Sequence, residues 1–306
     1  MTKLLAHSGV TEDALNEFKK LGDLVVDPME TEERICELIK DVDALIIRSK
    51  PHVTKKCIEA AKNLKVIGRG GVAISNIDQD AQDLCKERGI NIVTTPEATT
   101  ISVAEMAFSL IFSLLRNVPQ GDASMRRGEW ERKKFMGNEL NGKSWGILGF
   151  GRIGRAVAER LSDFGVNLYA HDPYCNKEIC SGYGALKIDD FDEFLSKCDI
   201  ISIHCALVPE TKHLLNKESL AKLPDGAYVI NLARGAIVDT KALIEALKSG
   251  KLSGAALDVY EQEPPEDKEL LELDNIVITP HLGASTVEAQ ERATSTLFEK
   301  LKEELK

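Results

Sequence analysis

Three side chains that could carry out hydride chemistry follow separate apolar runs in the second half of the chain. They are Arg234, Glu263 and His281, and Asp258 lies between the first two. A histidine can take a hydroxyl proton near neutral pH, and a carboxylate against its second ring nitrogen fixes its tautomer. An arginine can bind a carboxylate through two hydrogen bonds and polarise the adjacent carbonyl. These residue types favour hydride transfer at a hydroxyl-bearing carbon beside a carboxylate.

Each of these residues also has an ordinary structural interpretation. An isolated loop histidine is most often a surface residue, Arg234 could form a surface ion pair, and Glu263 could be an exposed acid in a proline turn. The apolar runs before these residues, however, are typical of successive strands of one parallel sheet. Because ligands bind beyond the carboxyl ends of such strands, the occurrence at three strand ends favours a common site.

A glycine-rich turn near the middle of the chain indicates the hydride carrier. It consists of Gly149, Phe150, Gly151, Arg152, Ile153 and Gly154. An apolar run precedes it, a helical stretch follows it, and a second strand-like run ends near Asp172. Strand, glycine turn, helix, strand and acid together form the dinucleotide-binding pattern, whereas a lone glycine turn could belong to any α/β domain.

Each part of this pattern has a physical role. Gly149 allows the tight turn, Gly151 lets the backbone approach a pyrophosphate, and Gly154 allows close packing of helix on sheet. The pyrophosphate would face the free N–H groups and the positive dipole end of the helix. Asp172 would accept hydrogen bonds from a ribose 2′-hydroxyl and repel a 2′-phosphate, so NAD is favoured over NADP.

The elements that would position these residues alternate along the chain. Strands are expected at residues 4–6, 24–26, 44–47, 65–67, 90–93, 145–148, 166–170, 200–204, 228–232, 255–257 and 276–279. Helices are expected at residues 11–21, 31–39, 55–61, 78–88, 99–117, 155–164, 240–247 and 286–306. This alternation predicts an α/β protein with doubly wound parallel sheets. The helix at 99–117 is apolar on most faces, which predicts that it is buried.

The composition limits the class of protein. A length of 306 residues with 43% hydrophobic residues suggests two domains with buried cores. No run of 18 apolar residues occurs, so no membrane partner is expected, and the net charge of −10 argues against nucleic acid. Seven scattered cysteines without a CxxC pair predict reduced thiols, a cytoplasmic location and no metal. Cys175 and Cys180 lie close in sequence but lack a second ligand pair.

Longer motifs spread over nearly all of the chain are similar to those of a known family. They are residues 68–78, 95–96, 102–105, 140–143, 231–239, 256–265 and 279–286. On these motifs the chain resembles the D-isomer-specific 2-hydroxyacid dehydrogenases. Residues 130–137 are similar to a narrower branch, whose members oxidise 3-phospho-D-glycerate to 3-phosphohydroxypyruvate at the entry to serine biosynthesis.

The resemblance implies two Rossmann-like domains and NAD as cofactor. We expect a discontinuous substrate domain of residues 1–98 and 281–306, with an NAD domain of residues 99–280 inserted into it. Hinge closure would exclude water from the crevice, and a homodimer would form through the region 99–140. Longer relatives carry a regulatory domain that binds serine after the helix at 286–306, so serine feedback is not expected here.

The resemblance also implies roles for individual residues. His281 would be the acid/base, Glu263 its partner, and Arg234 the ligand of the substrate carboxylate. Asp258 would bind the nicotinamide carboxamide. Further cofactor contacts would fall on Val72, Gly149, Gly151, Arg152, Ile153, Gly154, Asp172, Cys205, Leu232, Ala233, Gly283 and Ala284. Contacts to a small phosphorylated 2-hydroxy acid would fall on Arg48, Ser49, Gly70, Gly71, Asn76, Arg132 and Lys133.

Several alternatives stay open at this point. Arg132 and Lys133 could equally form a solvated basic turn. Thr99 stands where the family often has asparagine, and a hydroxyl cannot reproduce the two-sided hydrogen bonding of an amide. A glyoxylate or hydroxypyruvate reductase would keep the same catalytic residues without a phosphate site. An NAD-sensing corepressor would keep the cofactor site but would need a peptide-binding groove.

Overall fold

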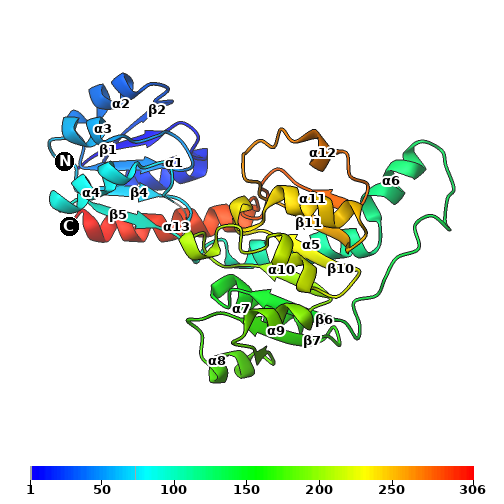
Figure 1. Cartoon of the computed structure of the whole chain (residues 1–306). Helices are drawn as coiled ribbons and strands as arrows, with labels where there is room; N and C mark the ends of the chain where they lie inside the picture. The colour runs from blue at the N-terminus through cyan, green and yellow to red at the C-terminus, as the bar shows by residue number, and fades with distance from the viewer. Residues whose placement is uncertain (1, 73) are drawn as a thin grey trace. The chain divides into compact units, whose positions relative to one another are not determined.

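Two parallel β-sheets, of five and seven strands, organise the described part of the chain (Figure 1). The structure is a computed structural model that describes residues 2–72 and 74–306, so Met1 and Ala73 lie outside the described residues. The chain divides into a first unit, Met1–Thr99 with Ser285–Lys306, and a second unit, Thr100–Ala284. The predicted α/β class with two doubly wound parallel sheets is confirmed.

The first unit contains the five-stranded sheet, in the order β2-β1-β3-β4-β5. Its strands are β1 (Lys3–His7), β2 (Asp23–Asp27), β3 (Ala44–Ile47), β4 (Val66–Arg69) and β5 (Asn91–Thr94). Its α-helices are α1 (Glu12–Phe18), α2 (Glu32–Leu38), α3 (Lys55–Ala60), α4 (Gln79–Glu87) and α13 (Val287–Glu304). The short 3-10 helices η1 (Lys19–Leu21) and η2 (Ile39–Asp41) follow α1 and α2.

Alternation of side chains along the strands explains why helices cover both faces of this sheet. Leu5 and Leu45 belong to the core cluster under α2, α3 and α4. Their neighbours Leu4 and Ile46 belong to the opposite cluster, under α1 and α13. Because successive side chains of a strand point to opposite faces, an apolar run without alternation predicts a strand buried on both sides.

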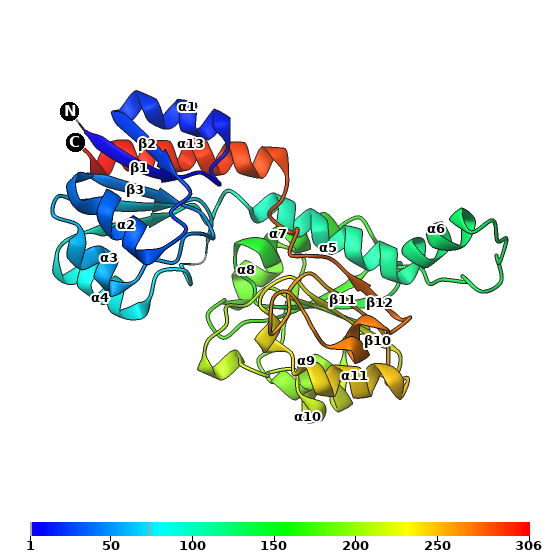
Figure 2. The same ribbon diagram turned by 90° about the horizontal axis from the view of Figure 1, so that it is seen from above.

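Helix α13 returns the end of the chain to the first unit, where Figure 2 shows it alongside α1. Thr286 caps its first turn by accepting a hydrogen bond from the backbone N–H of Ala289. A Cβ at Gly68 would lie 3.0 Å from a methyl carbon of Leu301, so glycine there permits close packing of helix on strand. Residues far apart in sequence thus share one core.

The second unit contains the seven-stranded sheet, in the order β12-β11-β10-β9-β6-β7-β8. Its strands are β6 (Ser144–Leu148), β7 (Asn167–His171), β8 (Leu186–Lys187), β9 (Ile200–Ile203), β10 (Ala227–Asn231), β11 (Leu252–Leu257) and β12 (Ile276–Ile278). Its α-helices are α5 (Thr100–Leu115), α6 (Val118–Arg126), α7 (Arg152–Leu161), α8 (Lys177–Gly182), α9 (Phe191–Ser196), α10 (Lys217–Lys222), α11 (Thr240–Lys248) and α12 (Lys268–Leu271). Two 3-10 helices, η3 (Pro209–Thr211) and η4 (Gly235–Ile237), lie in its loops.

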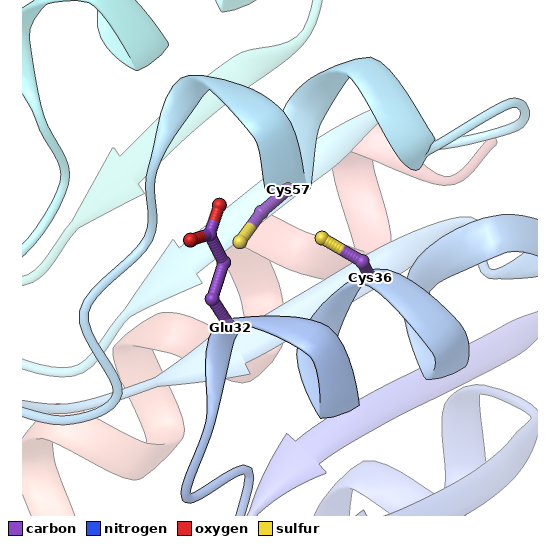
Figure 3. A group of neighbouring side chains, drawn as sticks. All are labelled: Glu32, Cys36 and Cys57. Carbon is purple, nitrogen blue, oxygen red and sulfur yellow. The ribbon is translucent and has the colours of Figure 1, made fainter.

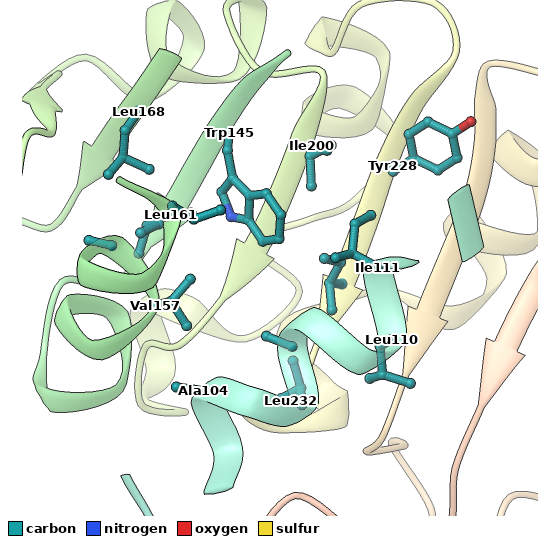
Figure 4. Packing of buried hydrophobic residues seen from close by; sticks show 14 of the residues in the cluster. Ala104, Leu110, Ile111, Trp145, Val157, Leu161, Leu168, Ile200, Tyr228 and Leu232 are labelled. Atoms are coloured by element: carbon teal, nitrogen blue, oxygen red, sulfur yellow. The ribbon is translucent and has the colours of Figure 1, made fainter. Parts of the chain in front are cut away.

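Trp145 lies at the centre of one core of the second unit, between the sheet and helices α5 and α7 (Figure 4). It is fully buried, and its indole N–H donates to the hydroxyl of Ser202 at 2.8 Å. Side chains of α5, including Leu110 and Ile111, belong to the same cluster. The predicted burial of the apolar helix is therefore confirmed.

The helix expected at 99–117 is shorter than predicted and is followed by a second helix that sequence reasoning missed. Asn117 has a φ of 51°, a left-handed conformation that ends the first helix before α6 begins. The axes of α5 and α6 meet at a bend of 62°. By length and composition alone, the two helices together would be long and apolar enough to cross a membrane. Among the described residues no single helix is long and apolar enough to do so.

Candidate active site

Three neighbouring strands end at one edge of the sheet in the second unit. β10 pairs with β11, and β11 pairs with β12, all in parallel. Arg234 follows β10, Asp258 follows β11, and His281 lies shortly after β12. Because parallel strands place their carboxyl ends on the same edge, the three side chains lie on neighbouring loops there.

His281 and Glu263 form a hydrogen-bonded pair. Nδ1 of His281 lies 2.8 Å from Oε2 of Glu263, whose second oxygen accepts from the backbone N–H of Tyr260 at 3.2 Å. An ionised carboxylate can only accept, so Nδ1 carries the hydrogen and Nε2 is left to act as an acceptor. The two side chains are 49% and 41% exposed, so Nε2 can meet a substrate.

Asp258 holds the turn that carries His281. Its Oδ1 accepts from the hydroxyl of Thr279 at 2.5 Å and from the N–H of Leu282 at 2.7 Å, and its Oδ2 accepts from the N–H of Gly283 at 2.7 Å. His281 has a φ of 55°, which is unfavourable for a residue with a Cβ. Three charge-assisted hydrogen bonds to a carboxylate that is only 1% exposed offset that cost. The contact to a nicotinamide carboxamide stays a prediction.

Asn231 braces the turn that carries Arg234. Its amide nitrogen donates to the carbonyl of Arg234 at 2.9 Å, and its amide oxygen accepts from the N–H of Ala233 at 3.1 Å. The half-buried guanidinium donates from Nη1 to the carbonyl of Ala233 at 2.6 Å. Since a guanidinium has five donors, this single bond leaves a planar edge able to bind a carboxylate.

Gly235 lets the Arg234 turn lie directly on the loop that leads to Glu263. A Cβ at position 235 would overlap the carbonyl group of Tyr260 and the backbone nitrogen of Glu261. The two loops therefore touch through backbone atoms. Any side chain at position 235 would separate Arg234 from the carboxylate loop.

Tyr260 connects that loop to the turn before His281. Its hydroxyl lies 2.8 Å from the carbonyl of Thr279 and 3.2 Å from that of Leu257, and it donates to these acceptors. Burial raises the pKa of Tyr260 to about 12, so the hydroxyl keeps its proton at physiological pH. The three loops that carry the predicted catalytic residues are thus joined by direct contacts.

A second histidine at the carboxyl edge of the sheet has a different chemical state. His204 follows β9, and both of its ring nitrogens are buried without a hydrogen-bond partner among the described residues. Burial lowers the pKa of His204 to about 3, so its imidazole is neutral at physiological pH. A base that must gain a proton during turnover is therefore better sought in the exposed His281.

The glycine turn lies where the strand order of the second sheet reverses, between β6 and its neighbour β9. Gly149 has a φ of 94°, and a Cβ there would overlap the backbone nitrogen of Cys205. A Cβ at Gly154 would overlap the carbonyl oxygen of Gly149. At Gly151, by contrast, a Cβ would meet nothing within 4 Å, so this residue faces open space at the start of α7. A glycine backbone that faces open space at a helix N-terminus fits a pyrophosphate.

Asp172 lies just after β7, and two backbone groups fix its position. Its Oδ2 accepts from the N–H of Phe150 at 2.7 Å, and its Oδ1 accepts from the N–H of Tyr174 at 2.8 Å. The first bond ties the acid directly to the glycine turn. Each carboxylate oxygen can accept a further hydrogen bond, so the geometry fits a ribose hydroxyl.

The remaining cofactor residues predicted in the second unit lie near the same edge. They are Arg152 and Ile153 in the first turn of α7, Cys205 after β9, Leu232 and Ala233 after β10, and Gly283 and Ala284 beyond His281. Burial raises the pKa of Cys205 to about 11, so its thiol stays neutral and adds no charge beside the glycine turn.

The predicted substrate residues of the first unit lie in two loops that brace each other. The amide of Asn76 donates to the carbonyl of Arg48 at 3.1 Å and to that of Pro51 at 2.7 Å. Gly70 donates its N–H to the carbonyl of Ile47, and Gly71 donates to the hydroxyl of Thr95 at 2.9 Å. The loop positions Ser49 and Val72 are exposed.

Arg132 and Lys133 are exposed and lie between α6 and β6. Figures 1 and 2 show this segment running away from the sheet of the second unit. Within that unit the structure brings Arg234, Glu263 and His281 together but does not add these two basic residues to them.

Sequence reasoning missed residues that position the site rather than react. They are Asn231, Gly235, Tyr260, Thr279 and His204. Asn231 is the last residue of β10, and the others follow strands β9 to β12, so their place in the sequence was the available signal. Tyr260, Thr279 and Gly235, however, contact residues on other loops, and these contacts cannot be deduced from spacing.

Comparisons with known proteins identify the family of the chain. A family model described as the NAD-binding domain of D-isomer specific 2-hydroxyacid dehydrogenases matches residues 108–283. The D-3-phosphoglycerate dehydrogenase of Methanocaldococcus jannaschii is 45% identical over 306 residues, which cover 100% of this chain and 58% of that protein. The hydroxypyruvate reductase of Thermotoga maritima is 42% identical over 276 residues, which cover 89% of this chain and 88% of that protein.

Solved structures of related enzymes share the fold. A glyoxylate reductase from Paecilomyes thermophila superposes with a TM-score of 0.89 at 32% identity, covering 100% of this chain and 95% of that one. A D-lactate dehydrogenase from Aquifex aeolicus in complex with NAD and lactic acid superposes with a TM-score of 0.84 at 28% identity, covering 98% of this chain and 94% of that one. The chain thus spans just over half of the length of the Methanocaldococcus jannaschii dehydrogenase but nearly the full length of these two solved enzymes.

Proposed function

The chain belongs to the D-isomer-specific 2-hydroxyacid dehydrogenases, and we propose that it oxidises 3-phospho-D-glycerate to 3-phosphohydroxypyruvate with NAD. The observation that carries the reaction type is the 2.8 Å contact between His281 and Glu263 on the sheet edge that also carries Arg234. The substrate choice is supported by relatives named D-3-phosphoglycerate dehydrogenase at 44 to 46% identity.

The side chains would act as follows. Arg234 binds the substrate carboxylate and holds the hydroxyl-bearing carbon near His281. Nε2 of His281 takes the hydroxyl proton, while Nδ1 keeps its own proton and donates a hydrogen bond to Glu263. The ionised Glu263 balances the positive imidazolium that results. Bound NAD supplies the hydride acceptor.

A phosphate-binding role is proposed for the basic residues outside this set. Arg48 follows β3 in the first unit, and its loop is held by Asn76. Arg132 and Lys133 would supplement it, from the same chain or from a partner subunit. A guanidinium offers the paired donors that a phosphate accepts.

A specific observation favours a second candidate, reduction of hydroxypyruvate or glyoxylate. The hydroxypyruvate reductase matches over 88% of its own length, whereas the phosphoglycerate dehydrogenase of Methanocaldococcus jannaschii matches over 58%. Such an enzyme would need the same residues for hydride and proton transfer but no phosphate site. The phosphate group therefore distinguishes the two candidates.

Matched substrates test the choice. We expect kcat/KM with NAD to be at least about 100-fold higher for 3-phospho-D-glycerate than for D-glycerate, because two or more charge-assisted hydrogen bonds are lost without phosphate. Arg48→Gln should lower kcat/KM only for the phosphorylated substrate. Lys50→Gln serves as a control at a nearby exposed residue. Equal values for the two acids, with rapid reduction of hydroxypyruvate by NADH, would establish the second candidate. NAD binding without turnover of any of these acids would favour a sensor.

We also propose a cytoplasmic homodimer. The segment between α5 and β6 exposes Met125, Trp130 and Met136, with Trp130 73% and Met136 82% accessible. Large exposed apolar side chains in one segment are typical of an interface. All seven cysteines are free thiols, which fits a reducing compartment. Sedimentation equilibrium should give a dimer, and the double change Trp130→Ser with Met136→Ser should shift it towards monomer.

A further inference from the structure

Two thiols and a carboxylate meet between two helices of the first unit. Glu32 begins α2, Cys36 lies one turn further along it, and Cys57 lies on α3. One oxygen of Glu32 and the two sulfur atoms all lie within 4.8 Å of one another. Figure 3 shows the three side chains pointing towards one another in the space between the helices.

The surroundings of this cluster hold its groups in place. Cys57 is fully buried, Cys36 is half-buried, and the Glu32 side chain is 35% exposed. The hydroxyl of Thr54 donates to Oε1 of Glu32 at 2.9 Å and lies 3.5 Å from the sulfur of Cys57. One side of the cluster therefore faces the core and the other reaches solvent.

We propose that Glu32, Cys36 and Cys57 form a binding site for a thiophilic divalent cation, with Zn²⁺ as the ion whose ligand preference fits them. Zinc binds thiolate sulfur at about 2.3 Å and carboxylate oxygen at about 2.0–2.2 Å in a tetrahedral arrangement. Such a centre places its sulfur atoms about 3.8 Å apart. The separations of the three ligand atoms exceed this geometry by no more than about 1 Å, since all lie within 4.8 Å of one another. Water on the solvent side would complete the tetrahedron.

The local charges suit such an ion. Two thiolates and one carboxylate carry three negative charges, of which a divalent cation neutralises two. The ammonium group of Lys56 lies 3.8 Å from Oε1 of Glu32 and 3.9 Å from Oε1 of Glu33, so it partly balances the third. Burial raises the pKa of the Cys36 thiol to about 11, so a bound ion must displace its proton.

None of the three ligands belongs to the residues proposed for hydride transfer. All three lie in the first unit, whereas Arg234, Glu263 and His281 lie in the second. A bound ion would join α2 to α3, which cover the same face of the five-stranded sheet. Its expected effect is therefore on the stability of the first unit rather than on hydride transfer.

Cadmium titration of the reduced full-length protein tests the proposal. Cd²⁺ takes the same ligands as zinc, and its bonds to thiolates absorb in the ultraviolet, so sulfur ligation is read directly. We expect saturation at one ion per chain, displacement of Cd²⁺ by excess Zn²⁺, and a higher melting temperature with Zn²⁺. Cys36→Ser should remove the absorption, and Glu32→Gln should keep it but weaken binding at least tenfold.

A second pair of thiols in the protein provides the matched control. The sulfur atoms of Cys175 and Cys180 lie 3.6 Å apart in the second unit. Cys175→Ser with Cys180→Ser should leave the cadmium absorption and affinity unchanged. Loss of absorption in this control, its persistence in Cys36→Ser, or an unchanged affinity in Glu32→Gln would overturn the three-ligand site. Circular dichroism and NAD binding verify that each variant is folded.

Discussion

Replacing Glu263 with glutamine is expected to lower kcat by about 30- to 900-fold while leaving NAD affinity nearly unchanged. Glutamine keeps the length of the side chain and one acceptor for Nδ1 of His281. It removes the negative charge that balances the imidazolium formed when His281 takes the hydroxyl proton. The substitution should therefore weaken stabilisation of the transition state rather than cofactor binding.

The expected magnitude follows from the 2.8 Å contact between Nδ1 of His281 and Oε2 of Glu263. Unit charges whose centres lie about 4 Å apart attract by about 4 kcal/mol at an effective dielectric constant of about 20. Both side chains are nearly half exposed, so solvent screening reduces this towards about 2 kcal/mol. Since about 1.4 kcal/mol changes a rate tenfold, the range of about 2–4 kcal/mol corresponds to the expected loss.

Glu261 provides a matched control on the same loop. Its Oε2 lies 2.8 Å from Nε2 of His213, and its Oε1 accepts from the N–H and the hydroxyl of Thr240. Glu261→Gln disturbs a glutamate–histidine pair of the same length, so it reports the effect of loosening the loop without changing the proposed base. We expect kcat to fall less than about tenfold in this variant.

The assay is single-turnover formation of NADH at saturating NAD and substrate, with NAD affinity measured separately by fluorescence. Single turnover isolates hydride and proton transfer from product release. Equal losses of rate in Glu263→Gln and Glu261→Gln would refute the charge argument, because both glutamates would then act only by holding the loop in place. A loss of NAD affinity in Glu263→Gln as large as its loss of rate would refute it as well.

Three further outcomes are expected. Gly235→Ala should lower stability by about 1–3 kcal/mol and reduce kcat, because its Cβ would overlap backbone atoms of Tyr260 and Glu261; full activity with an unchanged melting temperature would contradict that overlap. Asp172→Ser should weaken NAD binding about tenfold and raise the NADP to NAD affinity ratio, since it removes a charged acceptor and the repulsion of a 2′-phosphate; an unchanged ratio in fluorescence titrations would remove Asp172 from the ribose site. Burial lowers the pKa of His204 from 6.5 to about 3, so the unfolded chain binds a proton below about pH 6.5 that the folded one does not, and stability falls as the pH falls. Between pH 7 and 5 the free energy of unfolding, measured with urea, should fall by about 2 kcal/mol more in the native protein than in His204→Gln. Equal falls in the two proteins would show that His204 is not buried as a neutral group.

All strands except the two-residue β8 could be predicted, because their signal is local. Leu4 and Leu5 belong to opposite cores, and a run that is apolar at every position is what burial on both faces requires. The break between α5 and α6 could not be predicted in this way. It depends on the left-handed conformation of Asn117, which the surrounding apolar sequence does not reveal.

The candidate catalytic residues could be predicted because each follows a strand of one sheet. Their supports could not, because contacts between loops depend on the fold. Asp258 accepts from Leu282 and Gly283, which lie more than 20 residues later in the chain. Glu32 and Cys36 likewise meet Cys57 only because two helices pack together, so the spacing of cysteines in the sequence does not reveal this cluster.

The chain contains two histidine–glutamate pairs of equal length, so distance alone does not identify a base. His281 contacts Glu263 through Nδ1, the ring nitrogen nearer the backbone, and presents Nε2 at the tip of the side chain. His213 contacts Glu261 through Nε2, which leaves only the inner nitrogen. A base must reach a substrate beyond its own loop, and only the first arrangement presents the outer nitrogen for that purpose. The direction of the hydrogen bond, together with the place of His281 after β12, supports the proposal that the first pair serves proton transfer and the second supports the carboxylate loop.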